Sequence, residues 1–206
     1  SIQINYSYQI PENFYNADFN VNRTDILSTK DGAIYSIAQW YPRLCVLDDI
    51  EGWNTLPYLG NGEFYLEYGD FNVNITLPAA YMVVASGELL NPQEVFTPLQ
   101  LKRWEQSKSS EEKVFIRTAA EVTNASSRPQ QPTLTWKFAI KNSRDFAWGA
   151  SKSFILEGIG INLPDGKKAL GLSAYPVSSK QPQSWDRSSE YVKFSIEYFS
   201  KKWQSY

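Results

Sequence analysis

FNVNITL, residues 71–77, alternates apolar and polar side chains at every position. A period of two is typical of a β-strand with one buried face and one solvated face. Residues 2–10 (IQINYSYQI) alternate in the same way before Pro11 and are predicted as a second such strand. Further strands are predicted at residues 34–47, in two pieces around Pro42, and at 63–66, 81–86, 114–122, 134–140, 146–156 and 169–176. Residues 12–31 and 158–168 are predicted as a surface loop and a turn region.

Two segments have helical signals. Thr97-Pro98-Leu99-Gln100 has the form of a capping box with proline at the first helical position, so a helix is predicted after Thr97. Residues 187–205 fit both a strand alternation and a helical stripe, but their charged side chains and their length without Gly or Pro favour a helix. The sequence therefore predicts a mainly β chain: an antiparallel β-sandwich or saddle-shaped curved sheet with one or two helices.

The composition excludes several kinds of chemistry. The chain has 206 residues, a formal net charge of -2, one cysteine (Cys45) and no histidine. Ser-His-Asp and Cys-His sites are impossible without histidine, and so is an HExxH zinc site. The near-neutral charge balance disfavours a nucleic-acid partner held by bulk charge. No apolar run approaches the roughly 20 residues of a membrane span, so none is expected.

Charge is unevenly distributed along the sequence. No basic residue occurs between Arg43 and Lys102, whereas eight acidic residues lie there. This stretch is interpreted as a solvated acidic face, with attraction of an amine, a cation or a basic partner as the alternative. Residues 48–54 (DDIEGWN) are favoured as a turn over a calcium loop, because they lack EF-hand spacing.

Aromatic and ionic side chains also leave alternatives open. Trp40, Tyr41, Trp53 and Tyr58 are interpreted mainly as packing residues, with a sugar-stacking platform as the alternative. Arg144-Asp145 is expected to form a structural ion pair at a strand edge.

Several segments, taken in order, resemble one family. The segments on which the resemblance rests are residues 37–43 (IAQWYPR), 48–54 (DDIEGWN), 62–64 (GEF), 68–71 (YGDF), 77–78 (LP), 84–87 (VASG), 136–138 (WKF) and 144–148 (RDFAW). Their order and spacing are similar to the N-terminal β-domain of M1-family zinc metallopeptidases, the aminopeptidase N-like gluzincins. The resemblance covers most of the chain, from about residue 4 to its end.

The resemblance implies a domain division. Residues 1–160 would form the β-rich N-terminal domain, and residues 161–206 its end and the start of the catalytic domain, with a last helix at about 187–205. The family's HExxH helix, distal Glu ligand and GxMEN loop lie in that catalytic domain and do not occur here. We therefore expect a fragment without a catalytic residue, a metal ligand or a cofactor of its own, and zinc in the catalytic domain that would follow.

The resemblance also implies a substrate-binding position. In the family, a glutamine on the strand that reaches the cleft helps to hold the free α-amine and first side chain of the peptide; the matching position is Gln39. Tyr41 stands where the family has an acidic residue, and it is the second candidate for substrate binding. The expected partners are the chain's own downstream catalytic domain and, in the full-length protein, a peptide substrate.

Two other hypotheses come from different classes. One is a stand-alone β-sandwich module that binds carbohydrate or protein, and the other is a peptidase-like scaffold that lost catalysis. A domain that docks on a catalytic domain should expose an apolar patch, chiefly Val192, Phe199 and Trp203, whereas a self-sufficient module should cover it. The compartment stays open, with a periplasmic or extracytoplasmic location slightly favoured.

Overall fold

The alternating segment at residues 71–77 forms the middle of β5 (Gly69–Pro78), a strand of the first of three larger sheets. The computed structural model describes residues 1–10, 23–56, 64–180 and 184–206. β5 pairs antiparallel with β9 (Thr133–Ser143), and β7 (Glu88–Leu89) pairs with the other edge of β9. Ile75 lies opposite Trp136, and both are buried, so the apolar face of the alternation points into the core as predicted.

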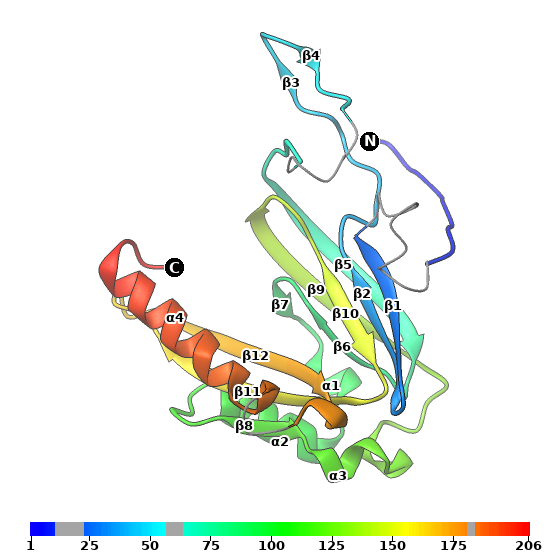
Figure 1. The fold of residues 1–206 in the computed structure, drawn as a ribbon, viewed down its shortest axis with the longest axis vertical. Helices are drawn as coiled ribbons and strands as arrows, with labels where there is room; N and C mark the ends of the chain where they lie inside the picture. Colours follow the sequence, from blue (N-terminus) through cyan, green and yellow to red (C-terminus); the bar gives the residue numbers. More distant parts are fainter. Residues whose placement is uncertain (11–22, 57–63, 181–183) are drawn as a thin grey trace.

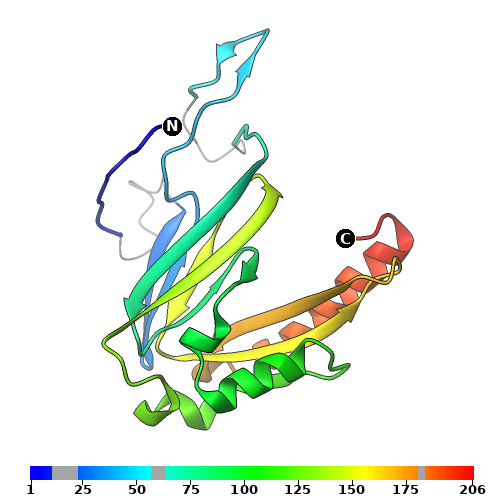
Figure 2. The same cartoon turned by 180° about the vertical axis from the view of Figure 1, so that it is seen from behind.

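The second sheet packs beside the first (Figures 1 and 2). Its four strands, in spatial order, are β1 (Thr24–Thr29), β2 (Gly32–Ile37), β10 (Trp148–Ser151) and β6 (Met82–Ala85). Met82 and Ala150 from this sheet share one buried cluster with Ile75 and Phe138 from the first. The pair of sheets is the sandwich that the sequence predicted.

The third sheet consists of β12 (Lys168–Pro176), β11 (Phe154–Asn162) and β8 (Val114–Arg117), in that order. Helices α2 (Pro98–Ser107) and α4 (Ser188–Lys202) cover its two faces. Glycines permit this close packing. A Cβ added at Gly158 would lie 2.9 Å from Ser107 Oγ on α2, and one at Gly171 would lie 3.4 Å from Val192 Cγ1 on α4.

Shorter elements connect and extend the sheets. The hairpin of β3 (Leu47–Asp48) and β4 (Gly52–Trp53) projects beyond the sandwich at the top of Figure 1. The remaining elements are single turns: α1 (Pro92–Val95), α3 (Ala119–Val122), η1 (Ala125–Ser127), η2 (Val177–Ser179) and η3 (Trp185–Arg187). The fold is thus mainly β with two helices longer than one turn, which confirms the predicted fold class.

Both predicted helices form. Thr97 Oγ1 accepts from the Gln100 N–H at 3.3 Å, and Gln100 Oε1 accepts from the Thr97 N–H at 3.3 Å, so the predicted capping box is present. α4 occupies residues 188–202 of the predicted range 187–205. The helical alternative was therefore the correct one for this ambiguous segment.

Six predictions need correction. The predicted loop at residues 12–31 contains β1 (Thr24–Thr29), and the second piece of the predicted strand 34–47 is not a strand before Leu47, where β3 begins. Residues 2–10 are extended but form no strand, and their apolar side chains are largely exposed because no partner strand covers them in the described chain. The segment 114–122 ends as a strand at Arg117, because Thr118 and Glu121 form a second capping box that starts α3. Residue 63 lies outside the described residues, and 64–66 form no strand.

The last correction concerns residues 146–168. A turn at Lys152 and Ser153 divides the predicted strand 146–156 into β10 and β11, and β11 continues to Asn162 in place of the predicted turn region. The predicted domain boundary at 160/161 consequently falls inside β11, which pairs with β12 over nine residues on both sides of it.

Candidate functional site

Gln39 follows β2 in an unusual backbone conformation. Its φ is +52°, a left-handed value that non-glycine residues rarely adopt. Its side-chain oxygen Oε1 is buried and has no hydrogen-bond partner among the described residues. Backbone strain together with an unmatched buried acceptor is uncommon in folded proteins, and such residues cluster at functional sites.

The neighbouring Tyr41 is fixed by a polar cluster. Its hydroxyl donates to Asp145 Oδ1 at 3.1 Å, and the same oxygen pairs with the Arg43 guanidinium. The Arg43 guanidinium also lies 4.8 Å from the centre of the Tyr41 ring. Burial raises the pKa of Tyr41 to about 12, with Arg43 opposing and Asp145 adding to the rise. The Tyr41 hydroxyl is therefore neutral near pH 7 and already engaged.

Trp40 attaches the same segment to the sandwich. Its Nε1 donates to the Phe146 carbonyl at 3.0 Å, and its ring packs edge-on against Trp148 with centroids 6.5 Å apart. The predicted ion pair of Arg144 with Asp145 does not form; Asp145 pairs instead with Arg43, and Arg144 lies over the Tyr68 ring at 4.8 Å. Sequence reasoning missed Arg43 as the partner, because 102 residues separate it from Asp145.

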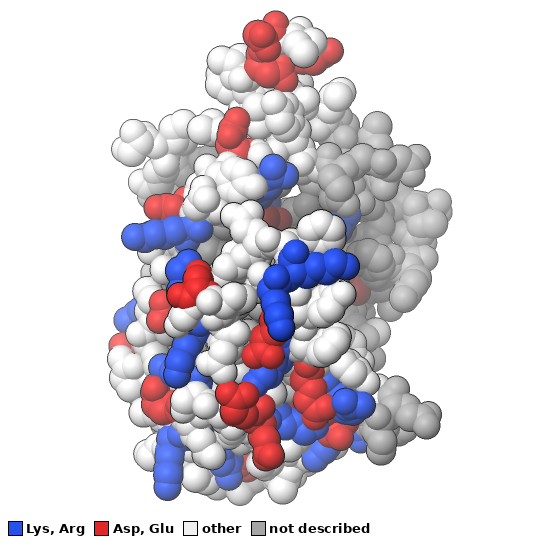
Figure 3. All heavy atoms as spheres, turned by 90° about the vertical axis from the view of Figure 1, so that its left-hand side faces the viewer, with Lys and Arg blue, Asp and Glu red and all other residues white. Residues whose placement is uncertain are grey.

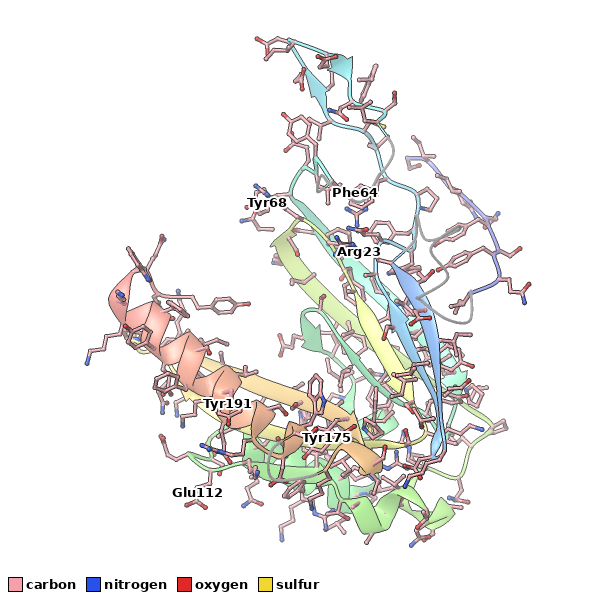
Figure 4. All side chains as sticks on the ribbon, viewed as in Figure 1. Arg23, Phe64, Tyr68, Glu112, Tyr175 and Tyr191 are labelled. Carbon is pink, nitrogen blue, oxygen red and sulfur yellow. The ribbon has the colours of Figure 1, made fainter. Side chains whose placement is uncertain are left out.

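Gln39 lies at one end of the sandwich. The N–H of Ala38, its neighbour, donates to the Arg23 carbonyl at 2.8 Å. Figure 4 places Arg23, Phe64 and Tyr68 together at the upper end of the two sheets, near the base of the β3–β4 hairpin. The structure thus brings the two predicted site residues to the end of the sandwich from which the hairpin projects.

The hairpin is both acidic and apolar. Its carboxylates belong to Asp48, Asp49 and Glu51, and Figure 3 shows acidic side chains gathered at this tip. Asp48 Oδ1 accepts from the N–H groups of Ile50 at 3.0 Å and Glu51 at 2.7 Å, so this carboxylate stabilises the predicted turn. Ile50 and Trp53 are 86% and 59% exposed. Trp53 is thus exposed, whereas Trp40 and Tyr41 pack against the core, and Tyr58 lies outside the described residues.

Helix α4 presents an aromatic outer face. Val192, Phe199 and Trp203 are 36%, 55% and 74% exposed, as expected for a docking patch. The exposed aromatic side chains on and just after the helix, which we call the α4 aromatic face, are Tyr191, Phe194, Tyr198, Phe199, Trp203 and Tyr206. Phe194 and Tyr198 stack on each other with centroids 5.9 Å apart, and Tyr198 packs edge-on against Phe199 at 5.4 Å, so three rings of this face are in contact.

Between the sandwich and the third sheet lies a cavity of about 520 Å³, which the sequence did not predict. Within the described ranges, no three His, Cys, Asp or Glu side chains lie close enough to share a metal ion. A zinc site does not fit these residues, because the chain has no histidine and Cys45 is exposed and alone. Among the helices of the described chain, none has the length and apolarity needed to cross a bilayer.

No family model matches this chain, and neither a curated protein nor a solved structure matches it. The fold and surfaces define a mainly β, sandwich-like protein with a helix-covered third sheet. Its candidate sites are the strained Gln39 segment, the cavity, and two exposed apolar surfaces.

Proposed function

We propose that this chain is the non-catalytic, β-rich N-terminal domain of an M1-family zinc metallopeptidase. In the full-length protein it would form a wall of the cleft in which peptides are hydrolysed from their N-terminus. The observation that carries the proposal is the α4 aromatic face, together with the resemblance of residues 37–148 to that family.

In helix α4, polar and apolar side chains are distributed in the opposite way to that of a usual surface helix. Its most buried side chains are Ser189 and Ser200, which are 0% and 6% exposed, whereas Phe194 and Trp203 are 68% and 74% exposed. A surface helix normally buries its apolar stripe and exposes its polar residues. An aromatic face of this size supports the docking of a further domain.

The edge of the third sheet supports the same idea. β12 is an outer strand in the order β12-β11-β8, and α4 follows it and packs on the same sheet. A strand followed by a helix across its sheet forms the first two parts of a βαβ unit. Among the described residues no strand pairs with the outer edge of β12, so a further parallel strand could pair there and bring a following domain against the α4 aromatic face.

Within the proposed cleft wall, Gln39 has the chemistry for holding a peptide amine. A neutral amide oxygen can accept a hydrogen bond from an ammonium group, and Oε1 has no competing partner among the described residues. Tyr41, held by Asp145 and Arg43, would fix the segment in place. Zinc belongs, in this proposal, to the catalytic domain, where it would polarise the scissile carbonyl and lower the pKa of its bound water.

The test uses the protein extended by its natural downstream sequence. We expect that protein to bind one zinc ion and to release amino acids from unblocked peptides but not from N-acetylated ones. Gln39→Ala should raise KM for unblocked peptides roughly tenfold, the value of one lost hydrogen bond to a charged group. Gln93→Ala, at an exposed position, is the control and should leave KM unchanged. A folded extended protein without zinc or peptidase activity would refute the proposal.

The β3–β4 hairpin favours a second candidate, a stand-alone module that binds a protein or carbohydrate. Ile50 and Trp53 project at its tip, where an aromatic ring could stack on a sugar. Under this alternative, Trp53→Ala would abolish glycan or protein binding, and replacing aromatic side chains on α4 would not affect function. The two candidates are thus separated by which exposed surface is required.

A further inference from the structure

A groove between two layers of the fold has no role in the proposed function. The cavity of about 520 Å³ lies between the sandwich, with β6, β7 and β9 on one side, and the inner face of β11 and β12 on the other. Its apolar walls include Leu89, Phe96, Trp136, Phe138, Leu170 and Leu172. Water in a groove with such walls finds few hydrogen-bond partners, so an apolar occupant would be favoured.

The groove is elongated along β12. Its lining follows this strand from Lys168 to Leu172, a distance of about 13 Å in an extended strand. Leu156, on the neighbouring β11, lines it as well and is 1% exposed. The groove therefore has a cationic side chain toward one end and apolar side chains along its length.

Three charged side chains line the groove: Glu88 from β7, Lys108 after α2, and Lys168 at the start of β12. Lys108 pairs with Glu105 at 2.9 Å and lies over the Trp104 ring at 5.9 Å. Lys168 forms no ion pair within the described part of the chain. Its charge helps to lower the pKa of the nearby Glu111 carboxyl, but no ion-pair contact among the described residues holds its ammonium group, so a ligand carboxylate can approach it, whereas Lys108 is shared with Glu105.

We propose that the groove binds an unbranched long-chain alkyl carboxylate, a fatty acid. The alkyl chain would lie between Phe138 and Leu172, where each buried methylene strengthens binding roughly fourfold. The carboxylate would pair with Lys168 at the open end. An alkyl ammonium of the same length would be repelled by Lys168 and by Lys108, and among the lining side chains only Glu88 would attract it, so the charge of the head group distinguishes the proposed ligand from a merely apolar one.

This inference is independent of the peptidase proposal, because residues of this chain alone form the groove. The 206-residue chain itself can therefore be tested. Trp104 and Trp136 line the groove and report on its occupancy. We expect dodecanoate to change the tryptophan fluorescence in a saturable way below roughly 1 mM with one site per chain, and a brominated dodecanoate to quench it. Dodecylamine and hexanoate should bind at least roughly tenfold more weakly.

Variants locate the site. Lys168→Glu should weaken dodecanoate binding roughly tenfold or more, as expected for loss of a charge-assisted contact. Lys141→Glu makes the same charge change at an exposed position on β9 and should leave the affinity unchanged. Leu172→Trp should fill the groove and abolish binding, with the melting temperature measured to show that the variant is folded.

Three results would overturn the proposal. They are the absence of saturable binding by the wild-type chain, equal affinity for dodecylamine and dodecanoate, and equal effects of Lys168→Glu and Lys141→Glu. If Leu172→Trp does not fold, the charge variants and the amine comparison still decide the question.

Discussion

The buried carboxylate of Glu157 on β11 accepts a hydrogen bond from Ser189 Oγ in the first turn of α4 at 2.7 Å. The same oxygen accepts from the Ser189 N–H at 3.4 Å, and the other oxygen accepts from the Tyr175 hydroxyl at 3.0 Å. Figure 4 shows Tyr175 near the beginning of α4. Because the side chain of Arg187, the N-cap residue of α4, makes no capping hydrogen bond to the helix backbone, a carboxylate from the sheet caps the helix in its place.

Removal of this carboxylate should loosen α4. Glu157→Ala leaves the donors of Ser189 and Tyr175 unmatched in a buried site, so we expect a loss of roughly 2–4 kcal/mol in the free energy of unfolding. Hydrogen exchange should accelerate first in residues 188–202. Urea unfolding and amide exchange measure the two effects.

The matched variant is Glu157→Gln. Its amide oxygen can still accept the hydrogen bond from Ser189, so this variant should lose less free energy of unfolding than the alanine variant. Equal stability of all three proteins, or unchanged exchange in α4, would show that the helix is held by other contacts.

The α4 aromatic face should contribute little to the stability of this chain by itself. Phe194 is 68% exposed, so Phe194→Ser should change the free energy of unfolding by no more than about 0.5 kcal/mol. The same change should reduce self-association at high concentration, measured by sedimentation velocity, because it removes exposed apolar surface. Under the proposed function, Phe194→Ser should instead lower the melting temperature of the protein that includes the proposed catalytic domain.

Ser195→Ala, one position away on the same helix and also exposed, is the control and should be neutral in both proteins. If Phe194→Ser destabilises the isolated chain and the extended one equally, the face does not dock a further domain.

Local patterns in the sequence predicted some elements and missed others, such as β1, which lies in a segment predicted as a loop. The alternation of residues 71–77 and the Thr97–Gln100 capping box each contain their signal within a few residues, and both elements form as predicted. The missed α3 had such a signal too, since Thr118 and Glu121 have capping-box spacing. Its apolar neighbours gave the stronger strand signal, and the prediction followed them.

The contacts between distant segments could not be predicted in this way. Asp145 meets Arg43, and Glu157 meets Ser189, only because the fold brings together segments that are far apart in the sequence. Arg128 is 4% exposed and donates to the carbonyl of Ala79 at 2.9 Å, an interior position that its charge alone would not indicate. The cavity likewise depends on how two layers pack, which no local pattern specifies.

The ion pair between Glu121 and Arg103 should make stability depend on pH. Arg103 Nη1 lies 2.9 and 2.8 Å from the two carboxylate oxygens. Partial burial alone would raise the pKa of Glu121, but hydrogen bonds from Thr118 and Arg103 outweigh it and leave the pKa below its usual value. A carboxylate with a lowered native pKa stabilises the fold above its unfolded pKa of about 4.3, and this stabilisation is lost as pH falls through the native value.

Glu121→Gln should therefore lower the free energy of unfolding by about 1–2 kcal/mol at pH 7. The difference in this free energy between the variant and the wild type should shrink below about pH 4. Urea unfolding at several pH values measures it. Glu105→Gln, which removes an exposed pair with Lys108, should cost less than about 0.5 kcal/mol at every pH. A difference for Glu121→Gln that stays constant down to the acid transition would contradict the assigned role of the charge.

Gly87 lies at a position that no other residue should tolerate. Its φ is +80°, and a Cβ added there would lie 2.3 Å from the Ala139 carbonyl oxygen on β9 and 2.8 Å from Ile140 Cβ. Gly166 has a similar φ of +83°, but nothing lies within 4 Å of its added Cβ. Both Ala variants carry the cost of a left-handed backbone, about 1 kcal/mol, and only Gly87→Ala adds a clash with the backbone of β9. Gly87→Ala should thus lower the free energy of unfolding, measured with urea, by at least roughly 2 kcal/mol more than Gly166→Ala does. The reason is that β9 must move away from β7 to make room for the added Cβ. Equal costs would mean that the approach of Gly87 to β9 does not constrain the sheet.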